Sequence, residues 1–206
     1  RLPSIGTAFG LERAGHDHTV AIIGDSTFVH AGIPSLIDAV YNGSSLTLII
    51  LDNSTTGMTG QQSHPAAGKT LRGKPAPKLD LAGLVRASGV KQVETVDTWD
   101  RKAVTRAIRA AVAHEGPAVV IAQGPCMRLP EMRLSERGAL PFFIAESLCT
   151  KCDACFKVWC PAITRTAQGF PVIDPLECTA CTVCAQVCPT DAIAPEGEQV
   201  VKAEAG

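Results

Sequence analysis

Eight of the nine cysteines stand in two arrays in the last third of the chain. Each array has three cysteines at intervals of two residues and a fourth that precedes a proline; the arrays are Cys149, Cys152, Cys155 and Cys160, and Cys178, Cys181, Cys184 and Cys188. Thiolates spaced in this way on a tight loop can reach three irons of one cubane, and the cysteine before the proline ligates the other cubane in chains that hold two. The spacing therefore predicts one [4Fe-4S] cluster on Cys149, Cys152, Cys155 and Cys188, and a second on Cys178, Cys181, Cys184 and Cys160.

Structural zinc and disulfides are two other uses of such cysteines. Zinc sites generally use pairs of cysteines separated by two residues, rather than triplets with a trailing cysteine and proline. Disulfides need an oxidising compartment, and we expect no signal peptide ahead of the fold. The gap of four residues before Cys160 is longer than the three-residue gap of simple bacterial ferredoxins. Cys126 stands outside both arrays, and we interpret it as a buried structural thiol at the end of a strand.

A carboxylate and an amide follow two apolar runs in the first part of the chain. The runs, residues 19–23 and 46–51, have the length and composition of strands that are buried on both faces of a parallel sheet. Between them, apolar residues recur at helical spacing, with Pro34 in the first turn: Ile33, Leu36, Ile37, Val40 and Tyr41. Asp25 and Asn53 therefore lie just beyond the carboxyl ends of two parallel strands, where open α/β sheets bind ligands.

Carboxylate and amide oxygens suit magnesium, which usually needs phosphate oxygens of a ligand to complete its coordination. The chain has no Gly-x-x-x-x-Gly-Lys-Ser/Thr loop and no Gly-x-Gly-x-x-Gly turn, so nucleoside triphosphates and dinucleotides are disfavoured. Gly24-Asp25-Ser26, followed after 26 residues by Asn53, resembles the thiamine-diphosphate motif, with Ser26 in place of its second glycine. Residues 24–34 and 52–62 resemble the alpha subunit of indolepyruvate ferredoxin oxidoreductases, in the 2-oxoacid:ferredoxin oxidoreductase superfamily. The cysteine arrays fit the same family, so the resemblance covers most of the chain.

The resemblance implies which residues hold the cofactor. Magnesium would bind Asp25, Asn53 and the backbone carbonyl of Thr55. The diphosphate and the thiazolium would be lined by Gly24, Ser26, Thr27 and Thr59. Met58 would lie at the cofactor where the related pyruvate enzymes carry Asn. Together with Phe28 beside the cofactor loop, Met58 favours an aryl 2-oxo acid as the substrate, because a thioether makes favourable contacts with aromatic rings.

Two histidines are candidates for contacts near the reaction. His30 follows Ser26 by four residues, and it either caps or packs the helix or contacts substrate or cofactor as a catalytic proton carrier. His64, in the loop of residues 63–78, is the second candidate. Loops of this length in compact domains are usually functional or mobile.

The implied activity is oxidative decarboxylation of a 2-oxo acid such as indolepyruvate. Coenzyme A would take the acyl group, and electrons would pass through the two clusters to a ferredoxin. Cofactor activation in this enzyme class needs a glutamate from a pyrimidine-binding domain that we do not find here. Activity would therefore need partner subunits that carry this domain and a gamma-type domain. Two alternatives remain open: an electron-transfer ferredoxin module docked to another enzyme, and a non-oxidative thiamine-diphosphate decarboxylase.

The sequence predicts an α/β fold in which part of a thiamine-diphosphate-binding, doubly wound parallel sheet precedes a small α+β domain like a bacterial ferredoxin. The expected divisions are a cofactor domain over 1–123, a linker rich in proline and arginine over 124–141, and a two-cluster domain over 142–206. The remaining expected helices cover residues 4–14, 79–88 and 99–114, and the remaining strands cover 92–96 and 118–122. Residues 142–145 are expected to pair with residues 200–203. Because such sheets normally have strands before the cofactor loop, we expect further sequence upstream or on another chain.

The composition limits the partners and the location. A net charge of −1 over 206 residues argues against nucleic acid and anionic membranes as partners. No apolar run approaches the roughly 18 residues of a membrane span. Cysteines in this spacing without a signal peptide indicate a reducing compartment, so a cytoplasmic location is expected.

Overall fold

The computed structural model describes residues 4–198, and the chain divides into two compact units, Arg1–Cys126 and Met127–Gly206. The first unit is built on a parallel four-stranded sheet in the order β1-β2-β4-β3. Its strands are β1 (Val20–Gly24), β2 (Thr47–Asp52), β3 (Gln92–Asp97) and β4 (Ala118–Gln123). The predicted α/β class with a parallel sheet is therefore confirmed.

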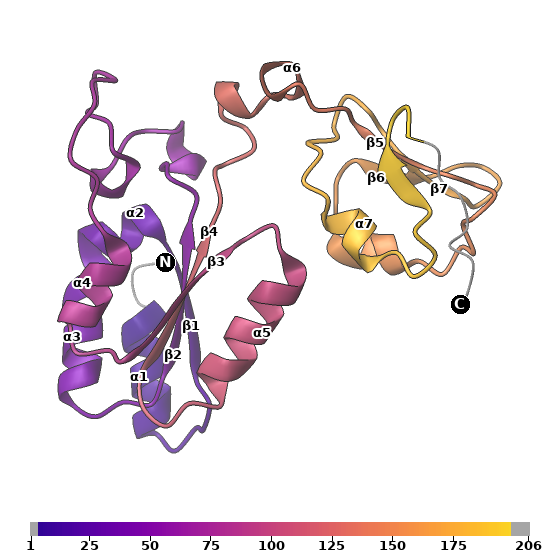
Figure 1. Ribbon diagram of the computed structural model, residues 1–206. Helices are drawn as coiled ribbons and strands as arrows, with labels where there is room; N and C mark the ends of the chain where they lie inside the picture. Colours follow the sequence, from indigo (N-terminus) through magenta and orange to yellow (C-terminus); the bar gives the residue numbers. More distant parts are fainter. Residues whose placement is uncertain (1–3, 199–206) are drawn as a thin grey trace. The chain divides into compact units, whose positions relative to one another are not determined.

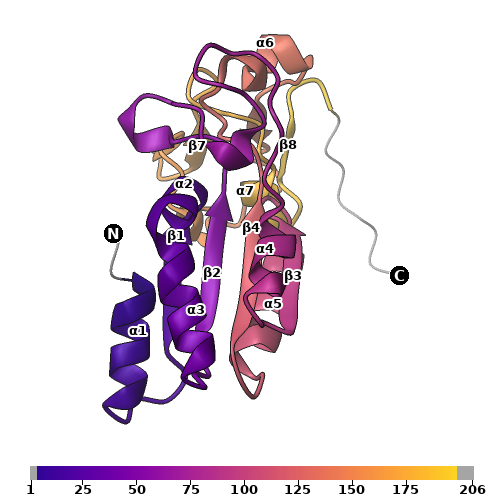
Figure 2. The ribbon, with the colours of Figure 1, turned by 90° about the vertical axis from the view of Figure 1, so that its left-hand side faces the viewer.

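Helices cover both faces of this sheet, as Figures 1 and 2 show. One face carries α1 (Ser4–Arg13), α3 (Ile33–Tyr41) and α4 (Leu81–Ala87), and the other carries α5 (Arg101–Val112). Asp80 and Asp100 act as N-caps, since their side chains accept the backbone N–H groups of Gly83 at 3.0 Å and Ala103 at 2.9 Å. These caps explain why α4 and α5 begin two residues later than the apolar pattern predicted.

The prediction that β1 and β2 are buried on both faces is wrong for part of their length. Ala21 and Ile23 face the core, but Val20 and Ile22 remain 43% and 55% exposed. Leu51 of β2, which pairs with Gly24, is 46% exposed. The physical reason is that α5 packs on β3, β4 and the start of β2, and no described helix covers the rest of that face.

The chain is helical directly after β1, earlier than the sequence predicted. The short helix α2 (Asp25–Thr27) continues through a π-helical turn, η1 (Phe28–Gly32), into α3 without leaving the helical region of backbone angles. Pro34 lies in the first turn of α3, as expected. In a regular α-helix its ring would clash with the carbonyl of His30, and the wider π turn fits this position. Asp25 is thus the first residue of a helix that points its amino end at the edge of the sheet.

The second unit is small and contains two antiparallel strand pairs. β5 (Phe142–Ile144) pairs with β8 (Ile193–Pro195), and β6 (Ile163–Arg165) pairs with β7 (Pro171–Ile173). The pairing expected with residues 200–203 lies outside the described residues; within residues 4–198 the partner of β5 is β8. The remaining elements are η4 (Pro130–Met132), α6 (Leu134–Arg137), η5 (Ala154–Val158) and α7 (Val183–Val187).

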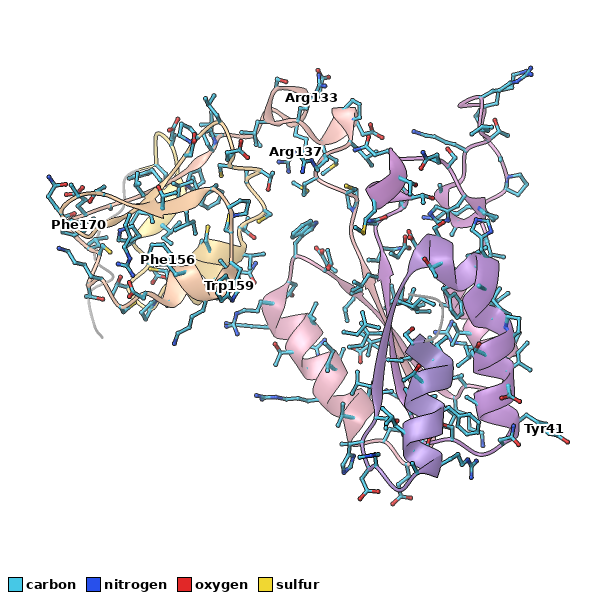
Figure 3. All side chains as sticks on the ribbon, turned by 180° about the vertical axis from the view of Figure 1, so that it is seen from behind. Tyr41, Arg133, Arg137, Phe156, Trp159 and Phe170 are labelled. Carbon is cyan, nitrogen blue, oxygen red and sulfur yellow. The ribbon has the colours of Figure 1, made fainter. Side chains whose placement is uncertain are left out.

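The expected linker is divided between the units, because residues 127–141 group with the cysteine-rich unit. The Arg137 side chain, labelled in Figure 3, donates to the carbonyls of Met132 at 3.0 Å and Thr179 at 2.5 Å. It therefore ties α6 to the second cysteine array. Among the described residues, no helix is both long and apolar enough to cross a bilayer.

Candidate cofactor and cluster sites

The Asp25 carboxylate lies at the end of β1 and is only 3% exposed. Its Oδ1 accepts the backbone N–H of Ser26 at 2.7 Å. Its Oδ2 accepts the N–H groups of Asn53 at 3.1 Å and Ser54 at 2.9 Å. The parallel pairing of Gly24 with Leu51 brings these strand ends together. The structure thus brings Asp25 and Asn53, which the sequence singled out, side by side at the carboxyl edge of the sheet.

Asp52 is a second buried carboxylate beside Asp25, and sequence analysis did not assign it to the site. It is 2% exposed, and its Oδ2 accepts the Gln123 side-chain amide of β4 at 2.7 Å. Burial raises the pKa of Asp25, and the neighbouring Asp52 raises it further, while the N–H of Ser26 and the nearby His64 act in the opposite direction. Two buried carboxylates in contact favour a compensating cation.

Two of the three residues expected to ligate the metal, Asn53 and Thr55, lie on one short turn after β2, opposite Asp25. Asn53 Oδ1 accepts the backbone N–H of Thr55 at 3.1 Å, and the Asn53 carbonyl accepts the N–H of Cys126 at 3.1 Å. Thr55 is 4% exposed. Thr56 donates its hydroxyl to that of Ser26 at 3.0 Å, which links this turn to α2. Carboxylate, amide and carbonyl oxygens suit magnesium, so the residues present fit the ion that the sequence predicted.

The other predicted cofactor residues lie on more open parts of the same edge. Met58 and Thr59 are exposed on a 3₁₀ turn, η2 (Gly57–Thr59). Thr27 is half-buried on α2, and His30 is exposed on the π-helical turn. Phe28, which was expected beside the cofactor loop as part of the case for an aryl substrate, is fully buried in the core and presents no surface to a substrate. A phenyl ring that follows a strand end by four residues packs inward here because the helix begins at Asp25.

Four cysteines from both arrays line one cavity of the second unit. They are Cys149, Cys152 and Cys155 of the first array and Cys188 of the second. Burial raises the pKa of the Cys155 thiol, and the nearby Cys149 and Cys152 add to this effect. Cys188 Sγ accepts the backbone N–H of Ala192 at 3.3 Å. This grouping is the one that the spacing predicted for the first cluster.

The other four array cysteines also lie together. Burial, reinforced by the neighbouring Cys181, Cys160 and Cys178, raises the pKa of Cys184 to about 12. Cys178 Sγ accepts the N–H groups of Phe142 at 3.4 Å and Ala180 at 3.5 Å, and such bonds stabilise a thiolate ligand. Because a thiol binds iron only as the thiolate, iron would have to displace this proton when a cluster is bound.

A left-handed turn at Trp159 accommodates the extra residue in the gap before Cys160. Trp159 stands in the left-handed region with φ 54°, at the end of η5, and its N–H donates to the carbonyl of Phe156 at 3.0 Å. Its side chain is 89% exposed (Figure 3). The turn returns the chain so that Cys160 reaches the second set of cysteines despite the longer gap.

The cysteine loops hold several non-glycine residues in the left-handed backbone region. They are Lys151, Asp153, Trp159, Ala180, Thr182 and Asp191. Each such residue costs of order 1 kcal/mol and persists only where the surroundings impose it.

Within residues 4–198, no three His, Cys, Asp or Glu side chains are placed to share a single metal ion.

Comparison with known families identifies the first unit. Residues 4–122 match the family described as thiamine pyrophosphate enzyme, C-terminal TPP binding domain. The chain belongs to the thiamine pyrophosphate enzymes. Residues 171–194, which include the second cysteine array, match the 4Fe-4S binding domain. One chain of this family thus combines a thiamine-diphosphate domain with an iron–sulfur domain.

Curated relatives confirm the resemblance found in the sequence. "Indolepyruvate oxidoreductase subunit IorA" of Methanothermobacter marburgensis is 45% identical over 95% of this chain and 31% of its own length. The subunit of the same name from Archaeoglobus fulgidus is 40% identical over 93% of this chain and 31% of its own length. "Pyruvate synthase subunit PorB" of Methanosarcina barkeri is 28% identical over 52% of this chain and 40% of its own length. The chain spans about a third of the length of the IorA relatives.

A solved structure shares the fold of the first unit. It is a 2-oxoglutarate:ferredoxin oxidoreductase from Magnetococcus marinus, with a TM-score of 0.55 and 21% identity over 61% of this chain and 45% of that chain. This likeness supports the α/β fold of the first unit.

Proposed function

We propose that this chain is the cofactor- and cluster-bearing part of a 2-oxo acid:ferredoxin oxidoreductase that acts on aryl pyruvates such as indolepyruvate. The observation that carries the proposal is the presence, on one chain of the thiamine pyrophosphate enzymes, of eight cysteines in two interlocked groups of four. Two groups of four cysteines can hold two iron–sulfur clusters, which carry one electron at a time. A thiamine-diphosphate enzyme needs such an electron path only when its reaction releases electrons to a one-electron acceptor. The names of the IorA relatives support indolepyruvate as the substrate.

Asp25, Asn53 and the backbone carbonyl of Thr55 hold magnesium on the diphosphate in this proposal. When bound, thiamine diphosphate supplies the electron sink for decarboxylation of the 2-oxo acid. The protein's part is to fix the diphosphate: Asp25 is oriented by three backbone N–H groups, and Ser26 is oriented by the Thr56 hydroxyl. The helix that begins at Asp25 adds the partial positive charge of its amino end near the phosphates.

The two cysteine groups would each hold one [4Fe-4S] cluster, and these clusters would supply the path for electrons to a ferredoxin in the cytoplasm. Coenzyme A takes the acyl group. Partner subunits or upstream domains supply the pyrimidine-binding domain and the gamma-type domain. His30, exposed on the π-helical turn, is available to contact substrate or a partner subunit at this edge.

The test is anaerobic turnover by the complete enzyme with its partner subunits. We expect indolepyruvate and coenzyme A to reduce a viologen or ferredoxin and to yield the aryl-acetyl thioester. Release of free aldehyde without acceptor reduction would instead identify a non-oxidative decarboxylase. Absence of bound thiamine diphosphate in the purified complex would favour an electron-carrier module.

Iron content provides a second, independent prediction. Anaerobically purified protein should contain about eight irons per chain, as expected for two cubanes of four. Air should bleach the visible absorbance of the clusters. Stoichiometric zinc in place of iron would contradict the cluster assignment.

Met58→Asn tests the basis of substrate choice. Met58 is 77% exposed on η2, at the edge that carries the cofactor residues. Sulfur–aromatic contacts contribute roughly 0.3–1.5 kcal/mol, so the substitution should lower the kcat/KM ratio of indolepyruvate to pyruvate by up to about tenfold. The ratio is measured in the complete enzyme, with Leu71→Asn, another exposed apolar residue of the same unit, as the control. A native preference for pyruvate would refute the aryl assignment, and an unchanged ratio would clear Met58 of this role.

A further inference from the structure

His64 is fully buried behind the carboxylate of Asp25. Its side chain is 0% exposed, although it belongs to the irregular segment that follows η2. Its Nδ1 accepts the backbone N–H of Ala66 at 3.4 Å and so caps the short turn η3 (Pro65–Ala67). A ring nitrogen that accepts a hydrogen bond carries no proton, so in the neutral ring the hydrogen lies on Nε2.

Nε2 is aimed at the metal-ligand candidate. It lies 3.2 Å from Asp25 Oδ2, outside ideal hydrogen-bond alignment, and it has no other partner among the described residues. A buried donor without a partner is costly, and a small tilt of the ring completes the bond to Oδ2. The same oxygen already accepts the N–H groups of Asn53 and Ser54.

Asp25 therefore joins both ends of one loop. Asn53 and Ser54 stand at the start of this loop, and His64 stands at its end. Met58 and Thr59, which the family resemblance places at the cofactor, lie between these ends. A loop that is held at both ends by one carboxylate is already ordered before a ligand binds. Ligand binding therefore costs little further conformational entropy in this loop.

We propose that His64 is a positioning residue for the magnesium-diphosphate site. Its Nε2–H orients the Asp25 carboxylate and closes residues 53–64 into the shape that receives the cofactor. This inference rests on the proposed function. Removing a group that hydrogen-bonds and orients a metal ligand typically lowers metal affinity by about 10–100-fold.

Two substitutions separate the two ring nitrogens. In His64→Asn, the side-chain oxygen can take the place of Nδ1 and still accept the Ala66 N–H, but nothing reaches Asp25. In His64→Gln, the longer side chain can place an amide N–H close to the position of Nε2. The pair therefore removes or retains the contact with Asp25 while both variants keep a neutral, polar residue in the pocket.

The experiment uses the complete enzyme, stripped of thiamine diphosphate and magnesium and still loaded with iron. Calorimetric titration with magnesium and thiamine diphosphate should show affinity reduced by about 10–100-fold in His64→Asn and largely retained in His64→Gln. Hydrogen exchange of residues 55–63 in the stripped enzyme should be faster in His64→Asn alone. Unchanged exchange in β2 and β4, with unchanged iron, shows that the variants are folded.

Wild-type affinity in His64→Asn would overturn the inference, as would equal losses in both variants with unchanged loop exchange. If the wild-type enzyme itself fails to bind thiamine diphosphate, the proposed function falls instead. The two failures are therefore distinguishable in one set of titrations.

Discussion

Asp25→Asn should abolish the retention of thiamine diphosphate by the assembled enzyme while leaving its iron content unchanged. The substitution keeps the size of the side chain but removes the charge that faces magnesium, and an amide offers only one of its two polar atoms as an acceptor. Its nitrogen would also meet backbone N–H donors from Ser26 or from Asn53 and Ser54, in a site that is 3% exposed. Asn53→Ala, which deletes the amide oxygen, should have the same effect.

The measurement is the cofactor content of the purified enzyme after gel filtration, compared with iron determined on the same sample. Asp38→Asn is the matched control, because Asp38 is an exposed carboxylate on α3 whose replacement makes the same chemical change. Thiamine diphosphate bound at wild-type affinity in Asp25→Asn would show that the site has been assigned wrongly. Loss of iron together with the cofactor would indicate a general folding defect.

Cys188→Ala should remove the cluster whose other three ligands belong to the first array, and Cys160→Ala should remove the other cluster. The reason is the grouping in the structure, where Cys188 shares a cavity with Cys149, Cys152 and Cys155. Cys160 instead lies with Cys184 and its neighbours. In the assembled enzyme, each variant should reduce viologen or ferredoxin only at background rates, because electrons then lack a complete path. Decarboxylation in a single turnover should survive, since it needs no acceptor.

Electron paramagnetic resonance of the reduced enzyme reads out which cluster is lost. Cys181→Ala should give the spectrum of Cys160→Ala, and Cys149→Ala should give that of Cys188→Ala. Cys126→Ala, outside both groups, is the control and should retain both signals. If Cys188→Ala matched Cys181→Ala instead, each array would hold its own cluster and the crossed assignment would be wrong. Equal loss of decarboxylation and acceptor reduction would make the cysteine unit a structural support.

The parts of the site that follow from local spacing could be predicted from the sequence. The ends of β1 and β2 were located because apolar runs stop at polar residues, and parallel pairing then requires Asp25 and Asn53 to meet. The cysteine groups followed in the same way from ligand spacing. Both cases depend on short-range patterns that leave the chain little choice.

The parts that depend on long-range packing could not be predicted. In the sequence Asp52 is an ordinary residue at the end of a strand. Its burial beside Asp25 depends on the pairing of β2 with β4, which brings the Gln123 amide to its carboxylate. His64 was a candidate for a contact near the reaction, but its position against Asp25 depends on how its loop folds back and could not be predicted. Phe28 was expected beside the cofactor loop as support for an aryl substrate, because the sequence did not reveal that the helix begins at Asp25 and turns this ring into the core. Cys126 was expected to be buried, but it is only partly so, and it serves Asn53 through its backbone N–H.

The crossed grouping of the cysteines sets an order for the making of the protein. The cysteines of one group are synthesised at different times, because each group takes three cysteines from one array and the fourth from the other. Cys149, Cys152 and Cys155 must wait for Cys188, and Cys160 must wait for the second array. A nascent chain can therefore hold no fully ligated cubane until almost the whole cysteine unit has been synthesised. The two proposed clusters can therefore be fully ligated only after Cys184 and Cys188 have been synthesised, when most of the cysteine-rich unit is available to fold around them.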